Sequence, residues 1–84
     1  MKIREEIDIN FKLDKYITRC IAELEEVYKK AQLIEDKTSE EYDDLEGKFY
    51  GLTLELEVHV MDSWRSGHFS ESDGDLLLYK YEAF

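Results

Sequence analysis

The sequence predicts a small, mainly α-helical domain built on an antiparallel helical hairpin. Two stretches, at about 11–36 and 39–66, place apolar residues three and four positions apart, which is the spacing of one face of a helix. Because only about two or three residues separate them, the second helix must turn back along the first. At a rise of about 1.5 Å per residue the hairpin should be roughly 40 Å long. The 84 residues form one domain, and 43% of them are hydrophobic, enough for a core.

The first helix is the clearest element. Residues 7–13 alternate between apolar and polar, which is a strand pattern, and the period then changes to that of a helix. Asn10 or Asp14 can supply the N-cap. The apolar face of the helix consists of Leu13, Ile17, Cys20, Ile21, Leu24, Val27, Tyr28, Ala31 and Ile34.

The second helix has two possible caps and one ambiguous stretch. Thr38, with Glu41 three positions later, forms a capping-box signature, and Ser39 offers a competing cap. Residues 51–61 also alternate strictly, as a half-buried strand would, but the helical spacing continues through them and their Leu and Glu residues favour helix. Gly67 indicates a Schellman-type stop.

The last element, at about 76–84, fits either a short helix or a strand. Leu77, Tyr81 and Phe84 have helical spacing, whereas Leu77, Tyr79 and Tyr81 alternate. We expect a short helix after the hairpin. The alternative is an α+β fold with a small sheet from residues 5–12, 51–61 and 76–83.

The hairpin alone leaves an apolar stripe on the second helix uncovered. Either the terminal segments or a second copy of the chain must cover it, and we expect a homodimer. The stripe consists of Tyr50, Leu54, Val58 and Met61.

Charge is the feature that says most about function. The chain has 21 acidic and 11 basic residues, a formal net charge of −10, and seven carboxylates fall within the twelve positions around the hairpin bend. Those near the start of the second helix suit its positive end, whereas Glu35 and Asp36 follow a helix end, where cations are preferred. We expect the partner-binding residues to be Glu35, Asp36, Glu40, Glu41, Asp43, Asp44, Glu46, Glu55 and Asp62.

The negative balance predicts a basic protein as the partner, and neither nucleic acid nor a membrane directly, because binding of phosphates depends on Lys and Arg. A rigid helix that presents carboxylates can occupy the basic groove of a nucleic-acid-binding enzyme. Small acidic inhibitors of restriction, CRISPR and repair enzymes that phages encode are similar in length and charge, although no motif ties this chain to one of them. We therefore expect a non-catalytic inhibitor or nucleic-acid mimic of the anti-restriction or anti-CRISPR type.

Self-association is an alternative function. Aromatic residues are enriched in interface cores, so a structural or adaptor subunit could work through an aromatic surface. The candidate interface residues are Trp64, Tyr79, Tyr81 and Phe84.

A weak calcium module at 71–82 is a further alternative. Acidic residues occupy positions 1, 3, 5 and 12 of a twelve-residue loop, but Leu76 stands where the loop normally has glycine. His59 could also share a metal with Glu55 and Asp62 on one helical face, but no second His is near in sequence. We expect no metal and no cofactor.

No arrangement in the sequence predicts catalysis. The serines and Cys20 have no base and acid at a suitable spacing, so we expect no enzyme. The single cysteine allows no internal disulfide and favours a reducing compartment. Since neither a secretion signal nor a membrane span is expected, the predicted location is the cytoplasm, that of the host if a phage encodes the chain.

Overall fold

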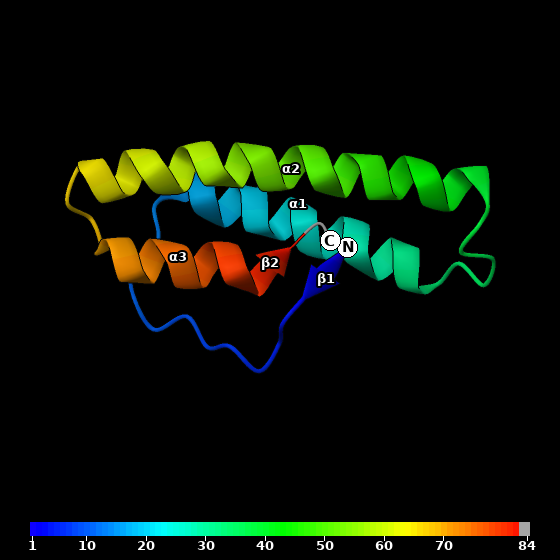
Figure 1. The fold of residues 1–84 in the computed structure, drawn as a ribbon, viewed down its shortest axis with the longest axis horizontal. Coiled ribbons are helices and arrows are strands. Elements are labelled where there is room, and N and C mark those ends of the chain that lie inside the picture. The colour runs from blue at the N-terminus through cyan, green and yellow to red at the C-terminus, as the bar shows by residue number, and fades with distance from the viewer. Residues whose placement is uncertain (83–84) are drawn as a thin grey trace.

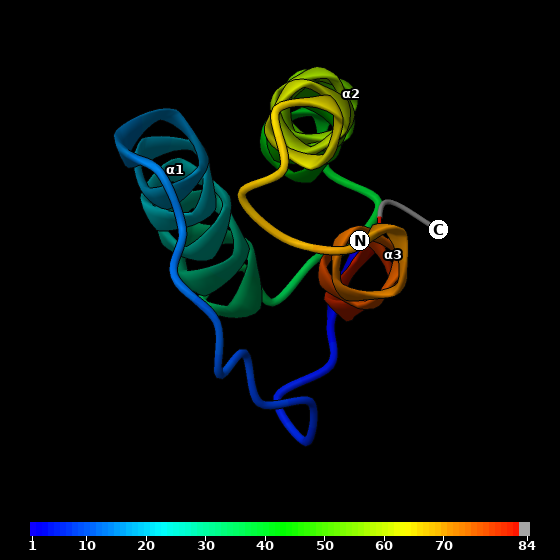
Figure 2. The same ribbon diagram turned by 90° about the vertical axis from the view of Figure 1, so that its left-hand side faces the viewer.

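The computed structural model describes residues 1–82, which form three helices and a two-stranded sheet (Figure 1). In chain order the elements are β1 (Lys2–Ile3), α1 (Lys15–Gln32), α2 (Glu40–Arg65), α3 (Glu71–Lys80) and β2 (Tyr81–Glu82). Both α1 and α3 run antiparallel to α2, and seen end-on the three helices occupy the corners of a triangle (Figure 2). The molecule measures 42 × 23 × 19 Å, so the mainly α fold and the length of the hairpin are confirmed.

α1 is shorter than the predicted helix at both ends. Asp14 is its N-cap and accepts a hydrogen bond of 2.9 Å from an N–H of the first turn, so the predicted start at residue 11 is wrong. Phe11 instead lies in the extended segment before α1, where its ring centroid is 5.2 Å from that of Phe69. At the other end, Lys37 donates from Nζ to the carbonyl of Ala31 at 2.8 Å, and the same carbonyl accepts from the N–H of Ile34 at 3.2 Å.

α2 begins and ends within one residue of the predicted bounds. Ser39 is the N-cap and accepts from the N–H of Tyr42 at 3.2 Å. The capping box at Thr38 is wrong, because the hydroxyl of Thr38 donates to Asp36 at 2.6 Å instead. Gly67 has a φ of 80° and ends α2 with the hydrogen bonds of the expected Schellman stop.

The small sheet of the α+β alternative is wrong at 5–12 and 51–61, and within 76–83 only Tyr81–Glu82 forms a strand. Residues 51–61 belong to α2, where alternate apolar residues fall on two different faces of one helix: Leu56 is buried and Leu54 is exposed. Residues 5–12 form no strand. The two strands that the described residues do form pair Lys2 with Glu82 and Ile3 with Tyr81.

The C-terminal helix is longer on its N-terminal side than predicted. α3 begins at Glu71, because Ser70 caps it by accepting from the N–H of Asp73 at 3.1 Å, and it gives way to β2 at Tyr81. The amine of Lys80 donates to the carbonyls of Arg4 and Ile7, at 3.1 and 2.6 Å. These contacts tie the start of the chain to the end of α3.

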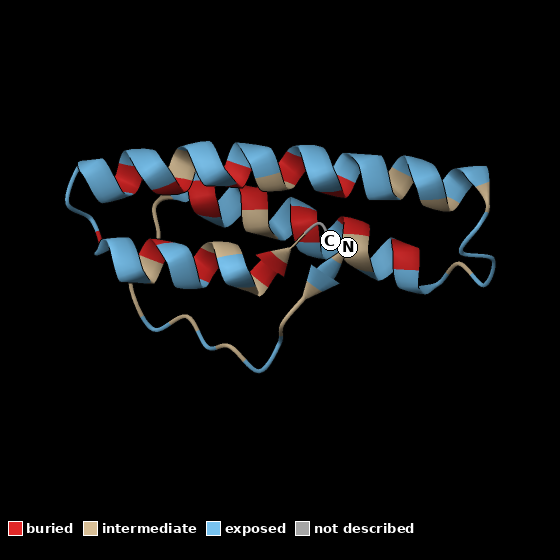
Figure 3. Ribbon diagram, viewed as in Figure 1, coloured by how far each residue is buried: buried red, intermediate tan, exposed pale blue. Residues whose placement is uncertain are grey.

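The core lies between α1 and α2 and is closed by α3 (Figure 3). Gly74 of α3 is buried against α2, and a Cβ added to it would lie 3.0 Å from Cγ1 of Val60. A glycine is thus what lets α3 pack this closely on α2. The largest side chains without exposed surface are Phe49, Ile17, Leu24, Leu56 and Leu77. No helix in residues 1–82 is long and apolar enough to cross a membrane.

Candidate functional site

All nine predicted partner-binding carboxylates are exposed, and seven of them gather at one end of the molecule. That end is where the chain leaves α1 and enters α2, on the right in Figure 1. We call it the acidic end and define it as Glu35, Asp36, Glu40, Glu41, Asp43, Asp44 and Glu46.

The acidic end is concave. Glu35 after α1 and Glu41 and Asp44 on α2 line one hollow of about 630 Å³. Leu33, which is 80% exposed, lies in the same hollow. Carboxylates from both sides of the hairpin bend therefore border an exposed apolar side chain.

Little within the chain neutralises the acidic end. None of the three ion pairs formed within residues 1–82 involves one of its carboxylates. Lys37 lies within this stretch, but its amine bonds the carbonyl of Ala31 and lies 5.1 Å from the ring centroid of Tyr42. Hydrogen bonds from the hydroxyl and N–H of Thr38 hold the pKa of Asp36 below its usual value, so that carboxylate has a local role in the turn.

Glu55 and Asp62 are exposed but do not belong to the acidic end. Glu55 follows Glu46 by nine residues, about 14 Å along α2. Its carboxylate lies 3.5 Å from Nε2 of His59, whose ring stacks on that of Tyr16 with centroids 5.7 Å apart. The predicted set of nine is thus divided between two parts of the surface.

The three aromatic candidates that the structure describes do not form one surface. Trp64 lies at the α2 end next to the start of α3, whereas Tyr79 lies near the end of α3, 3.8 Å below the guanidinium carbon of Arg4. Tyr81 is 4% exposed and donates its hydroxyl to Glu25 at 3.1 Å, and burial raises its pKa, so it is a core residue. Phe84 lies outside the described residues.

The calcium interpretation fails on geometry. Most of 71–82 is the helix α3, so Glu71, Asp73 and Asp75 do not lie in a loop that could wrap an ion. Within residues 1–82 no group of three or more His, Cys, Asp or Glu side chains is placed to hold a metal, and this includes the set around His59.

Ser63, Asp14 and His59 are the residue types of a catalytic triad, but they are not arranged as one. The hydroxyl of Ser63, which is 3% exposed, donates to the carboxylate of Asp14, while His59 faces Glu55 and Tyr16. A triad needs the imidazole between the serine and the acid. No local pattern indicates this contact, because Asp14 and Ser63 are 49 positions apart in the chain.

Cys20 is buried at the α1–α2 interface and donates from Sγ to the carbonyl of Leu52 at 3.3 Å. Burial, with Glu55 and Glu23 nearby, raises the pKa of its thiol to about 11. A thiol reagent at neutral pH should therefore label the native protein far more slowly than the protein in denaturant, since the thiolate is the reacting form. Equal labelling rates would contradict the burial of this side chain.

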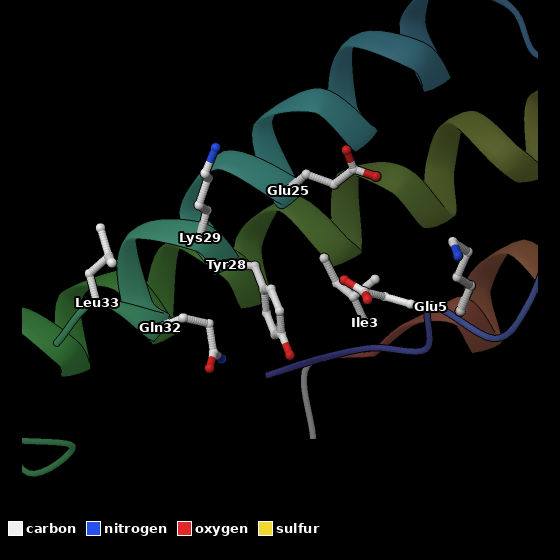
Figure 4. Close-up of a pocket in the computed structure, with 8 residues that line it drawn as sticks. Ile3, Glu5, Glu25, Tyr28, Lys29, Gln32 and Leu33 are labelled. Carbon is white, nitrogen blue, oxygen red and sulfur yellow. The ribbon is translucent and has the colours of Figure 1, made fainter. Parts of the chain in front are cut away.

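The hollow beside Tyr28 is a different kind of site (Figure 4). It has a volume of about 500 Å³ and lies between α1 and the start of the chain. Glu5 and Glu25 line it together with Lys29 and Lys80, so its charges are mixed. Nothing in this arrangement favours an anion or a cation as a ligand.

Comparisons with protein families, with curated proteins and with solved structures find no match to this chain. Charge, exposure and shape are therefore the properties of this chain from which its function can be inferred.

Proposed function

We propose that the chain is a non-catalytic acidic binding protein that occupies a basic, nucleic-acid-binding surface of a partner protein. It would act as an inhibitor or nucleic-acid mimic, in the cytoplasm where such partners work. The observation that supports this most directly is the charge density of the acidic end.

The first two turns of α2 carry negative charge about as densely as DNA does. Five carboxylates fall between Glu40 and Glu46, which span about 9 Å of helix axis. That is roughly one charge per 1.8 Å, and duplex DNA has about one per 1.7 Å. A groove that binds phosphates through Lys and Arg would meet a similar field at this end of the hairpin.

The hollow adds shape to this charge. Glu35, Glu41 and Asp44 line it together with Lys30, so a long basic side chain entering the hollow would meet three carboxylates and one amine. The exposed Leu33 would cover the methylene groups of such a side chain. Opposite charges would also accelerate encounter, and salt would weaken that effect.

The test is capture of the partner from a lysate of the source organism on the immobilised chain. We expect nucleic-acid-binding proteins to be retained at low salt and released by duplex DNA, because both compete for one basic groove. The variant Asp43→Lys/Asp44→Lys/Glu46→Lys should stay folded and retain none of them.

The matched control makes the same change of charge elsewhere. Glu5→Lys/Glu6→Lys/Asp8→Lys reverses three exposed carboxylates in the segment before α1 and should capture the partner as the unmodified chain does. Retention of the partner by the first variant, or partners that DNA does not release, would count against the proposal.

A further inference from the structure

A groove runs between α2 and α3, away from the acidic end. Two hollows, of about 220 and 330 Å³, lie along this line and share Glu57 and Leu78 as lining residues, so they form one trough. Gly74 lines the first hollow together with Met61 and Trp64, and a Cβ added to it would lie 3.0 Å from Cγ1 of Val60. We call this the α2–α3 groove and define it as Leu54, Glu57, Met61, Trp64, Asp75 and Leu78.

The groove has an apolar floor that continues onto the exposed face of α2. Leu54 is 50% exposed, and Met61 and Trp64 are also exposed. α3 has 10 residues and α2 has 26, so α3 covers only part of this side of α2 (Figure 1). The stripe expected to need a cover remains open to solvent. Exposed apolar side chains that adjoin in this way are typical of a binding surface.

The rim of the groove is acidic. Glu57 comes from α2, and Glu71 and Asp75 come from α3. Glu82 lies at the far end and pairs with Arg4 at 2.5 Å. Among the described residues that line the two hollows none is basic, in contrast to the hollow beside Tyr28.

We infer that the α2–α3 groove binds a basic amphipathic helix of a partner protein. Such a helix would place its apolar face on Leu54, Met61 and Trp64, and its Lys or Arg residues against Glu57 and Asp75. The apolar stripe from Tyr50 to Trp64 covers about 21 Å of α2, room for about four turns of helix. Methionine and tryptophan are suited to this contact, one by its adaptable shape and the other by its large area.

Charge decides against the other occupants. A second copy of this chain would bring its own acidic rim and a net charge of −10 to the contact. Nucleic acid and anionic lipid carry the same sign as the rim. This inference goes beyond the proposed function, because it uses another face of the molecule and requires no nucleic-acid-binding partner.

The probe is a synthetic peptide of about 18 residues without tryptophan, with Leu along one helical face and Lys on the other. Trp64 is the one tryptophan of the chain and lies in the groove, so its fluorescence reports occupancy directly. We expect a saturable change in its emission with the full chain. A scrambled peptide of the same composition should bind at least about tenfold more weakly, and a peptide with Glu in place of Lys should not bind.

Two matched pairs of variants locate the site. Glu57→Lys/Asp75→Lys should weaken binding at least about tenfold, whereas Glu6→Lys/Asp8→Lys changes the net charge equally in the exposed segment before α1 and should leave it within about twofold. Leu54→Ser should weaken binding, and Leu76→Ser, at an exposed leucine that lines neither hollow, should not. Thermal unfolding confirms that each variant is folded.

Each contrary outcome overturns the inference. No change in emission, equal binding of the scrambled peptide, or full affinity in Glu57→Lys/Asp75→Lys would show that the groove does not bind a basic helix. A dimer in sedimentation that Leu54→Ser dissociates would assign the groove to a second copy. If the unmodified chain binds the peptide but captures no partner that DNA releases, the proposed function is wrong and this inference remains.

Discussion

Replacing Phe49 by alanine is expected to lower the free energy of unfolding by about 3–5 kcal/mol. Phe49 has no exposed surface and lies where α2 packs on α1, with its ring centroid 6.3 Å from that of Tyr28. The substitution removes the apolar contacts of the Phe49 ring and leaves a cavity between α1 and α2, which the surrounding residues can fill only in part. In a domain of this size the loss is a large share of the total stability.

Urea unfolding followed by circular dichroism measures this effect. Val58→Ala is the control, since Val58 is an exposed apolar residue of the same helix and should change stability by less than about 0.5 kcal/mol. Equal effects of the two substitutions would contradict the packing of α2 described above.

Replacing Asp14 by alanine should cost about 2–4 kcal/mol, the second largest effect that we expect. The change removes the N-cap of α1 and also leaves the buried hydroxyl of Ser63 without its acceptor. Ser63→Ala should cost less, because no buried polar group is left behind. Adding Ser63→Ala to the Asp14 variant should then be neutral or stabilising, and additive losses in this double-mutant cycle would contradict the contact.

The same carboxylate predicts a dependence on pH. Burial acts to raise the pKa of Asp14. Hydrogen bonds from Ser63 and from the N–H groups of Ile17 and Tyr16 lower it, as does the nearby His59. Together these outweigh burial, so the pKa lies below 3.8. A pKa lowered by folding stabilises the native state above the unfolded pKa, and this contribution is lost as the pH falls through the folded pKa. The unmodified chain should have a higher free energy of unfolding than Asp14→Asn at about pH 5, and this difference should disappear as the pH falls to about 2.

Helix ends show how far local sequence can specify this fold. The stop at Gly67 and the helical character of 51–61 followed from glycine chemistry and from spacing along one chain segment. The start of α1 did not follow in the same way, because the two caps were equally good by local criteria. Asp14 is the cap in the structure, where it also accepts from Ser63 on another helix.

Part of the candidate site could also be predicted from the sequence, and part could not. The acidic residues were visible in the sequence as a charge excess, and their exposure at the bend follows from the hairpin. The α2–α3 groove was not visible, because it depends on which side of α2 the short last helix takes. Glu57 and Asp75 come from different helices and border one trough because α3 packs on α2, with Gly74 close to Val60.

By itself the sequence determined two long antiparallel helices, the ends of the second of them and a strongly acidic surface, since periodicity, capping and charge act between near neighbours along the chain. Tertiary structure alone decided the pairing of the two termini, the burial of Tyr81 and the groove beside Trp64. Each of these depends on contacts between residues that are distant in sequence, and their energies are settled only when the helices pack.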